Sequence, residues 1–226
     1  MFKRIFDVLV SLTGLIFFFP LLVGIACAIK LGDRGPILYR GERVGRGGGL
    51  FDIYKFRTMV VDAEKVGGSS TPDDDPRITK TGRFLRAYKL DELPQLINVL
   101  KGEMSFVGPR PQVSWAVKLY TTEEKAMLSV RPGITDFASI RFRNEAEILR
   151  GSVDPDKEYL EKIAPEKIRL GLVYVSTHSP WTDVKIIVAT LWTLLGGRPE
   201  RFLRVLRGPD EVAPVRSKVT ENGEVI

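Results

Sequence analysis

Two adjacent carboxylates, Asp91 and Glu92, lie in the segment LDELPQL at positions 90–96 and are the strongest candidates for chemistry. Pro94 fits the first turn of a helix, because proline is tolerated there and hardly anywhere else within a helix. Asp91 would then be the N-cap, and the positive helix end would keep it ionised and could hold a phosphate. Such a carboxylate is a suitable nucleophile for phosphorus. A plain structural cap is the competing interpretation, since Asp-Glu is common at helix starts.

Basic side chains gather in segments that are rich in glycine and proline or lie close to these carboxylates. Such loops fix the backbone, and the planar guanidinium of arginine suits phosphate oxygens, so these residues are predicted to bind a diphosphate. The candidates are Lys55 and Arg57 in KFRTM (55–59), Arg86, Arg110 in SFVGPRP (105–111) and Arg131 in RPGIT (131–135).

The composition narrows the chemistry. The chain has 226 residues with one cysteine, Cys27, and one histidine, His178. These counts exclude an internal disulfide and a cysteine-cluster metal site, and they disfavour histidine-based zinc chemistry and a Ser-His-Asp triad. Catalysis must therefore use carboxylates, Lys and Arg, with an oxygen-liganded metal as a further option. The net charge of +6 indicates an anionic membrane, a phosphorylated ligand or nucleic acid as partner, and the absence of a nucleic-acid-binding motif argues against the last.

Residues 8–29 form an uncharged apolar run that would span about 33 Å as a helix, enough to cross a bilayer core. Pro20 divides it into two arms, each near half a bilayer thickness. Basic residues on both sides suit a re-entrant helix with two cytoplasmic ends; prolines also occur in spanning helices, so a spanning helix stays open, as does a buried core helix. Asp7 is expected to pair with Lys3 or Arg4. The flanking basic residues are Lys3, Arg4, Lys30 and Arg34.

The rest of the pattern predicts an α+β domain that is mostly helical with a small β-hairpin. Two strands are expected within 35–60, joined by a glycine turn that lacks the spacing of a nucleotide fingerprint. An acidic loop beside the site is expected at 66–80, and its Asp73–Asp75 run is interpreted as solvated rather than metal-binding. Trp181 opens an apolar stretch that is either an interfacial helix or a core helix. Helices are expected at 81–101, 113–129, 156–170 and 181–195.

Four segments, KFRTM, LDELPQL, GEMSFVGPRP and RPGIT, occur in the order found in the monotopic phosphoglycosyl transferases, the bacterial sugar transferase family. The resemblance covers roughly residues 1–197, and without a large extension before the membrane segment the chain looks like the small form. It implies a re-entrant helix broken at Pro20, with the catalytic domain on the cytoplasmic face of the bacterial inner membrane. The implied parts are the membrane helix with its flanks (1–34), the catalytic domain (35–197) and a polar extension (198–226).

The resemblance also implies a reaction. Asp91 attacks the β-phosphate of a UDP-sugar, releases UMP and carries the phosphosugar until polyprenyl (undecaprenyl) phosphate takes it over. Mg²⁺ is the implied cofactor, with Asp91 near it. Glu92 would position or deprotonate groups, and the five basic candidates would neutralise the diphosphate. The implied partners are a UDP-sugar, a polyprenyl phosphate and the lipid bilayer; a homodimer is left open.

Three positions depart from the family pattern. Phe19 stands before the membrane proline where Ser is frequent, Glu103 where Asp is common, and Gln112 where an acidic residue is frequent. Asp183 matches a late acidic position of the family, although helix capping explains it equally well. Two alternatives stay open: a membrane-anchored glycosyltransferase that releases UDP, and a non-catalytic module that docks on anionic lipid.

Overall fold

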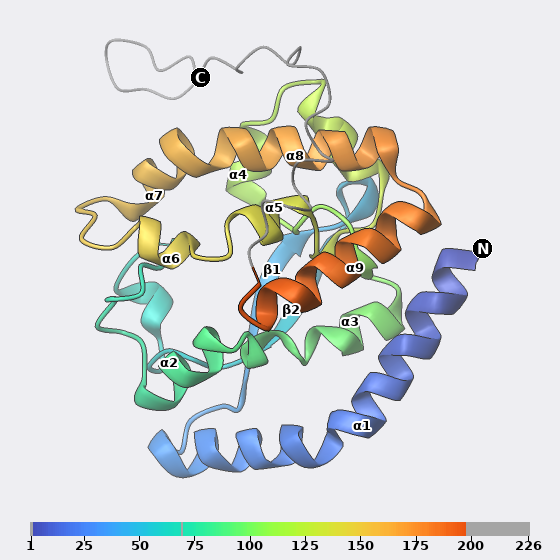
Figure 1. The fold of residues 1–226 in the computed structure, drawn as a ribbon. Coiled ribbons are helices and arrows are strands. Elements are labelled where there is room, and N and C mark those ends of the chain that lie inside the picture. The colour runs from blue at the N-terminus through green and yellow to red at the C-terminus, as the bar shows by residue number, and fades with distance from the viewer. Residues whose placement is uncertain (1, 69, 198–226) are drawn as a thin grey trace.

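The N-terminal apolar run forms one long helix. In the computed structural model, which describes residues 2–68 and 70–197, α1 extends from Phe2 to Asp33 and contains Pro20. Within those ranges it is the one helix long and apolar enough to cross a membrane, with a mean hydropathy of 2.5. Figure 1 shows α1 bent near its middle into two arms. A bend is expected where proline removes a backbone hydrogen bond and crowds the preceding turn.

The predicted hairpin is confirmed. β1 (Leu38–Val44) and β2 (Leu50–Phe56) are antiparallel, and the short 3₁₀ turn η1 (Arg46–Gly48) joins them. Gly47 and Gly48 have φ angles of 71° and 83°, a region that residues with a Cβ rarely enter. The glycine cluster therefore serves the turn, as its composition indicated.

The helix expected over 81–101 is broken into pieces. Lys89 has a left-handed backbone (φ 56°), which an α-helix of L-residues does not continue through. Pro94 is the N-cap of the last piece, and Asp91 lies upstream of it inside a 3₁₀ turn. The prediction that Asp91 caps this helix is therefore wrong. The pieces are α2 (Lys80–Ala87), η3 (Leu90–Glu92) and α3 (Gln95–Lys101).

A second, unpredicted sheet joins two of the arginine-containing motifs. β3 (Ser105–Val107) pairs in parallel with β4 (Gly133–Thr135). The two backbones are so close that a Cβ at Gly133 would lie 2.1 Å from the backbone nitrogen of Gly108. The pairing places the GPRP loop directly beside the RPGIT segment.

The predicted regions 113–129 and 156–170 are helical but segmented, whereas 181–195 forms one helix, α9 (Pro180–Leu194). Together with the two small sheets, these helices agree with the α+β class. α9 buries Ile186 and Ala189 while Trp181 and Trp192 stay 66% and 52% exposed, so it is a core helix on one face and apolar toward solvent on the other. The predicted extension at 198–226 lies outside the described residues. The remaining elements are η2 (Ala63–Lys65), α4 (Ser114–Lys118), η4 (Glu124–Ser129), α5 (Phe137–Arg141), α6 (Glu145–Ile148), α7 (Pro155–Glu158), η5 (Tyr159–Ile163), α8 (Ala164–Thr177) and α9 (Pro180–Leu194).

Two hydrophobic clusters position the elements that matter for the site. One lies between α5, α8, α9 and β3 around the fully buried Tyr174. The other joins the C-terminal arm of α1 (Ile25, Ile29) to Leu85 of α2, with Leu90 packed against it. Because Leu90 precedes Asp91, the second arm of α1 forms the support beneath the segment that carries the carboxylate pair.

The first arm of α1 is tied to the domain by polar contacts that cross the chain. Asp7 is 1% exposed and accepts hydrogen bonds from Ser105 Oγ (3.0 Å) and the backbone nitrogen of Phe106 (3.1 Å). The expected pairing of Asp7 with Lys3 or Arg4 is wrong, because both basic residues reach acceptors on other elements. Buried carboxylates need such partners.

Lys3 reaches the start of α9. Its Nζ lies 2.6 Å from Asp183 Oδ2, and Tyr174 Oη donates to Asp183 Oδ1 at 2.8 Å. The N-cap of α9 is Ser179, whose side chain accepts from the Thr182 backbone nitrogen. Capping therefore does not explain Asp183. Its carboxylate joins α1, α8 and α9.

Candidate active site

An open pocket of about 1130 Å³ lies against the segment that carries the carboxylate pair. It is bounded by the hairpin, α2, η3, the loop that follows β2 and the start of α6. Among the described residues its lining contains ten Lys and Arg against six Asp and Glu, an excess that favours an anionic ligand. Five predicted site residues are brought together here: Lys55, Arg57, Arg86, Asp91 and Glu92.

Asp91 is held in the wall of this pocket with an unused oxygen. The residue is 7% exposed, and its Oδ1 is buried without a hydrogen-bond partner among the described residues. The pKa of Asp91 is raised above its ordinary value, chiefly by burial and also by the charge of Glu92, although Lys55, Lys89 and Arg86 oppose this rise. A carboxylate whose role is capping would bond backbone N–H groups. The unused oxygen instead suits a ligand or reaction partner.

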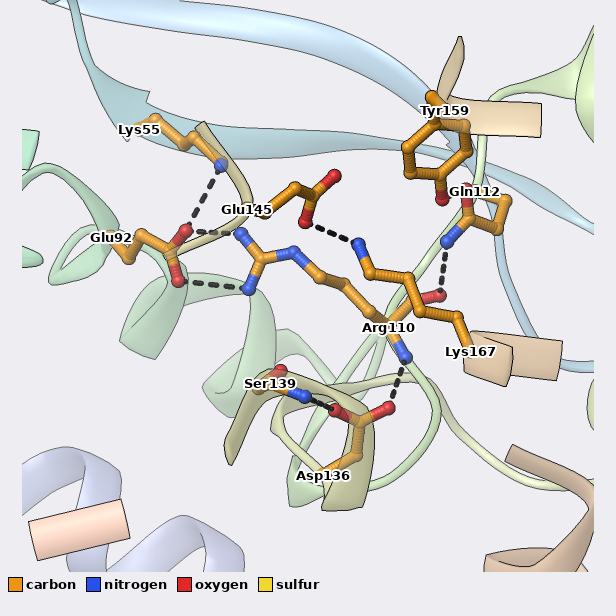
Figure 2. A network of polar contacts seen from close by, with 9 residues as sticks. All are labelled: Lys55, Glu92, Arg110, Gln112, Asp136, Ser139, Glu145, Tyr159 and Lys167. Carbon is orange, nitrogen blue, oxygen red and sulfur yellow. Dashed lines mark hydrogen bonds and ion pairs between the residues drawn. The ribbon is translucent and has the colours of Figure 1, made fainter. Parts of the chain in front are cut away.

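Glu92 is saturated by two cations, as Figure 2 shows. Lys55 Nζ lies 3.2 Å from its Oε1, and Arg110 donates from Nη1 to Oε2 at 3.1 Å and from Nη2 to Oε1. Burial opposes ionisation of Glu92, but the charges of Arg110 and Lys55 outweigh it and hold its pKa far below the ordinary value. Glu92 is therefore a fixed anion that positions two cations, and this environment disfavours proton transfer by it.

Arg110 is held through its backbone as well as through its guanidinium group. Its backbone nitrogen donates to Asp136 Oδ2 (3.3 Å), and Asp136 also caps α5 by accepting from the Ser139 backbone nitrogen (2.6 Å). Gln112 Nε2 lies 3.4 Å from the Arg110 carbonyl oxygen (Figure 2). Arg110, predicted as a phosphate ligand, thus spends both terminal nitrogens on Glu92 in this structure.

Arg86 and Arg57 come from neighbouring elements. Arg86 Nε donates to Thr58 Oγ1 at 2.9 Å, which aims the guanidinium from α2 toward the pocket it lines. Arg57 is 8% exposed and pairs with Asp33, the last residue of α1. The KFRTM segment therefore supplies Lys55, Arg57 and the orienting hydroxyl of Thr58 to one wall of the pocket.

Arg131 is not brought into this pocket. Its Nε donates to the carbonyl oxygen of Gly102 at 2.9 Å, and Arg4 donates to the carbonyl of Leu100 at 2.7 Å. The free carbonyls at the end of α3 attract both guanidinium groups, as expected for a helix C-terminus. The structure thus separates Arg131 from the other candidates.

Several lining residues escaped prediction. Lys89 adjoins the carboxylate pair, and its left-handed backbone could not be recognised from residue type. Arg83 lies one helical turn before Arg86, and this spacing could have identified it as a second lining arginine. Arg143 arrives from a segment some fifty residues further along, without any local signal. Arg40 and Arg43 lie on β1, and Trp115 lies on α4.

The acidic loop at 66–80 contains one residue, Asp75, that is not solvated as expected. Asp75 is buried and forms an ion pair with Arg77 at 2.7 Å. Arg77 holds the pKa of the Asp75 carboxyl below its usual range against the effect of burial. The interpretation of this acidic run as solvated is therefore wrong for Asp75.

The residues present fit a metal that is held mainly by substrate. Among the described residues no group of three or more His, Cys, Asp or Glu side chains could hold a metal ion. Mg²⁺ needs only one or two protein carboxylates when substrate phosphates complete its shell. Asp91 lines the pocket and forms no ion pair among the described residues, so it could supply that carboxylate, whereas Glu92 is already occupied by Lys55 and Arg110.

A carboxylate in the wall of a cationic pocket, on a domain with an apolar helix, suits phosphorylated ligands. The model of the bacterial sugar transferase family matches residues 1–197, and the chain belongs to this family.

Curated relatives agree with this assignment. A UDP-glucose:undecaprenyl-phosphate glucose-1-phosphate transferase of Caulobacter vibrioides is 39% identical over 196 residues, which cover 85% of this chain and 69% of that protein. A galactosyl transferase of Streptococcus agalactiae is 37% identical over 86% of this chain and 42% of its own length. A UDP-N-acetylgalactosamine-undecaprenyl-phosphate N-acetylgalactosaminephosphotransferase of Aeromonas hydrophila is 36% identical over 86% and 44%, respectively. The chain thus spans less than half the length of the last two proteins.

Proposed function

We propose that this protein transfers a sugar phosphate from a UDP-sugar to polyprenyl (undecaprenyl) phosphate, and that Asp91 carries the sugar phosphate between the two. The observation that carries the proposal is Asp91 itself: it lines a pocket with an excess of Lys and Arg, and its buried Oδ1 has no hydrogen-bond partner among the described residues. The activities for which the Caulobacter and Aeromonas relatives are named support the same substrate classes.

In the first half-reaction, an Asp91 oxygen forms a bond to the β-phosphorus of the UDP-sugar. The bond from that phosphorus to the oxygen bridging the two phosphates breaks, and UMP leaves with this oxygen. In the second, a phosphate oxygen of the polyprenyl acceptor bonds to the same phosphorus, and the bond to Asp91 breaks to restore the carboxylate. One phosphoanhydride is lost and one is gained, so the reaction needs no ATP, and catalysis consists of alignment and charge neutralisation.

The residues around Asp91 divide these tasks. Glu92 holds Lys55 and Arg110 in place, and Arg86 is oriented by Thr58 toward the pocket. Their charges offset the charge of the diphosphate as the bridging bond breaks. Asp91 and the substrate phosphates would hold Mg²⁺, which supplies further charge neutralisation when bound.

A re-entrant membrane helix is part of the proposal. A straight helix of 32 residues is about 48 Å long and would separate its ends across a bilayer. Here both ends contact the same domain: Lys3 at Asp183 near one end, and Asp33 at Arg57 at the other. This supports a hairpin-like insertion from the cytoplasmic face of a bacterial inner membrane, where the phosphate of a polyprenyl lipid lies.

One assay tests the reaction. The protein is incubated with Mg²⁺, undecaprenyl phosphate and a panel of UDP-sugars, and the nucleotide released is identified. We expect UMP, and a loss of more than about a thousandfold in Asp91→Asn, because an amide cannot attack phosphorus in this way. Release of UDP would indicate transfer of the sugar alone, and full activity of the variant would remove Asp91 from the mechanism.

A further inference from the structure

Arg57 is a buried cation with unused donors. It is 8% exposed, and its Nε and Nη1 have no hydrogen-bond partner among the described residues. Within the part of the chain that the structure describes, only Nη2 is engaged, in the ion pair with Asp33. Buried donors without partners are uncommon and call for an explanation. Since Arg57 lines the pocket, a ligand with acceptor oxygens would supply one.

The position of Arg57 distinguishes it from the other cations of the pocket. Its partner Asp33 is the last residue of the apolar helix α1. Gly35 leaves room for the guanidinium there, because a Cβ at that position would lie 1.9 Å from Arg57 Nη1. Arg57 is therefore placed where the membrane helix ends and the pocket begins.

Apolar side chains surround this end of the pocket. Val60 and Val61 line it and are 44% and 50% exposed, and Pro36 and Leu38 line it as well. A buried guanidinium next to open apolar side chains matches a ligand with a phosphate joined directly to a hydrocarbon chain. A nucleotide-sugar has no hydrocarbon chain to place there.

We infer that Arg57 binds the phosphate of the polyprenyl acceptor and that Val60 and Val61 contact the start of its hydrocarbon chain. The inference rests on the proposed function and assigns one cation of the pocket to the second substrate. Asp33 neutralises Arg57 while this subsite is empty, because a buried charge without a partner is costly. The bound phosphate then competes with Asp33 for the guanidinium.

The two half-reactions test this assignment separately. With UDP-sugar alone, the enzyme releases UMP in a single turnover that needs no acceptor; with undecaprenyl phosphate added, turnover continues. In Arg57→Met we expect the single-turnover rate to stay within about twofold, while the KM for undecaprenyl phosphate rises by at least about tenfold, the usual cost of a lost hydrogen bond to a charged group. Arg57→Lys should recover part of that loss.

Asp33→Asn separates binding from a merely structural ion pair. If Arg57 binds the acceptor phosphate, removing the competing carboxylate should lower the KM for undecaprenyl phosphate, opposite in sign to Arg57→Met. If the pair only anchors the end of α1, both variants should lose activity together. Arg46→Met, which removes an exposed arginine on the hairpin turn, is the matched control and should change neither half-reaction.

Three other outcomes would overturn the inference or the proposed function. A fall in both half-reactions in Arg57→Met, with the thermal unfolding midpoint preserved, would assign Arg57 to the donor diphosphate and overturn the inference. A fall that parallels a lowered unfolding midpoint in both the Arg57 and Asp33 variants would make the pair structural and also overturn it. If the unaltered enzyme releases no UMP from any UDP-sugar, the proposed function itself has failed.

Discussion

At position 92 a single carboxylate balances two cations that the fold has largely removed from water. Lys55 and Arg110 reach Glu92 from β2 and from the loop after β3. Breaking a buried pair is costly because the remaining charge loses its partner. The arrangement explains why Glu92 follows Asp91 directly: one residue fixes the cations and the other keeps its oxygen free.

We expect Glu92→Gln to lower the turnover number by about a hundredfold or more, because a neutral amide cannot hold Lys55 and Arg110 together beside the diphosphate. The measurement is UMP release at saturating UDP-sugar. Arg110→Met should have a similar effect, and the double variant should be little worse than either, since the two residues act as one unit. Additive losses would show that the two residues act independently.

Among the elements, the parallel β3–β4 pair controls where Arg110 lies. It depends on two glycines, Gly108 and Gly133, whose backbones approach too closely to admit a Cβ. No local pattern predicts this contact, because each strand has only three residues and the partners are far apart in sequence.

Gly133→Ala should therefore be destabilising by about 1–3 kcal/mol or more, because the Cβ would overlap backbone atoms that cannot move aside easily. It should also reduce activity by displacing the loop that carries Arg110. Thermal unfolding in detergent and UMP release measure the two effects. Gly49→Ala is the control: its φ of −66° suits alanine, and the nearest atom would be 3.8 Å away. Equal midpoints for the two variants would contradict the strand contact.

The bend of α1 at Pro20 (Figure 1) is a second feature of a single element that can be tested. Pro20 costs a continuous helix roughly 3 kcal/mol, so Pro20→Ala should let part of the population straighten across the bilayer. The test places a single cysteine at residue 2 (Phe2→Cys) in a Cys27→Ser background and adds a membrane-impermeant maleimide outside spheroplasts. We expect no labelling with Pro20 present and measurable labelling in Pro20→Ala. External labelling with Pro20 in place would establish a spanning helix.

For the whole molecule, polar contacts at both ends of α1 make this long apolar helix part of the domain. Lys3, Asp183 and Tyr174 join α1, α9 and α8, and burial raises the pKa of Tyr174 so that its hydroxyl remains a donor. Arg57 and Asp33 join the other end. The homodimer that the sequence left open stays a prediction.

Asp183→Asn tests this connection. We expect a loss of about 1–2 kcal/mol, less than for a fully buried pair because Lys3 is 37% exposed. The thermal unfolding midpoint in detergent should fall by roughly 2–8 °C. Lys162→Met, at an exposed ion pair on the helical segment η5, should leave the midpoint unchanged. An unchanged midpoint in Asp183→Asn would mean that the contact does not hold α1 to the domain.

The sequence alone determined the features that depend on residue type and local order. The apolar run with its proline, the glycine turn of the hairpin and the carboxylate pair among basic motifs are all local patterns, and hydrophobic periodicity and turn chemistry act over short distances.

Only the tertiary structure decided which charges meet. Glu92 pairs with Lys55 and Arg110, Arg131 contacts the end of α3, and the helix is interrupted at Lys89 before Asp91. Asp91 Oδ1 has no partner among the described residues. The physical reason is that the partner of a buried charge is chosen by long-range packing and desolvation, which depend on residues distant in sequence.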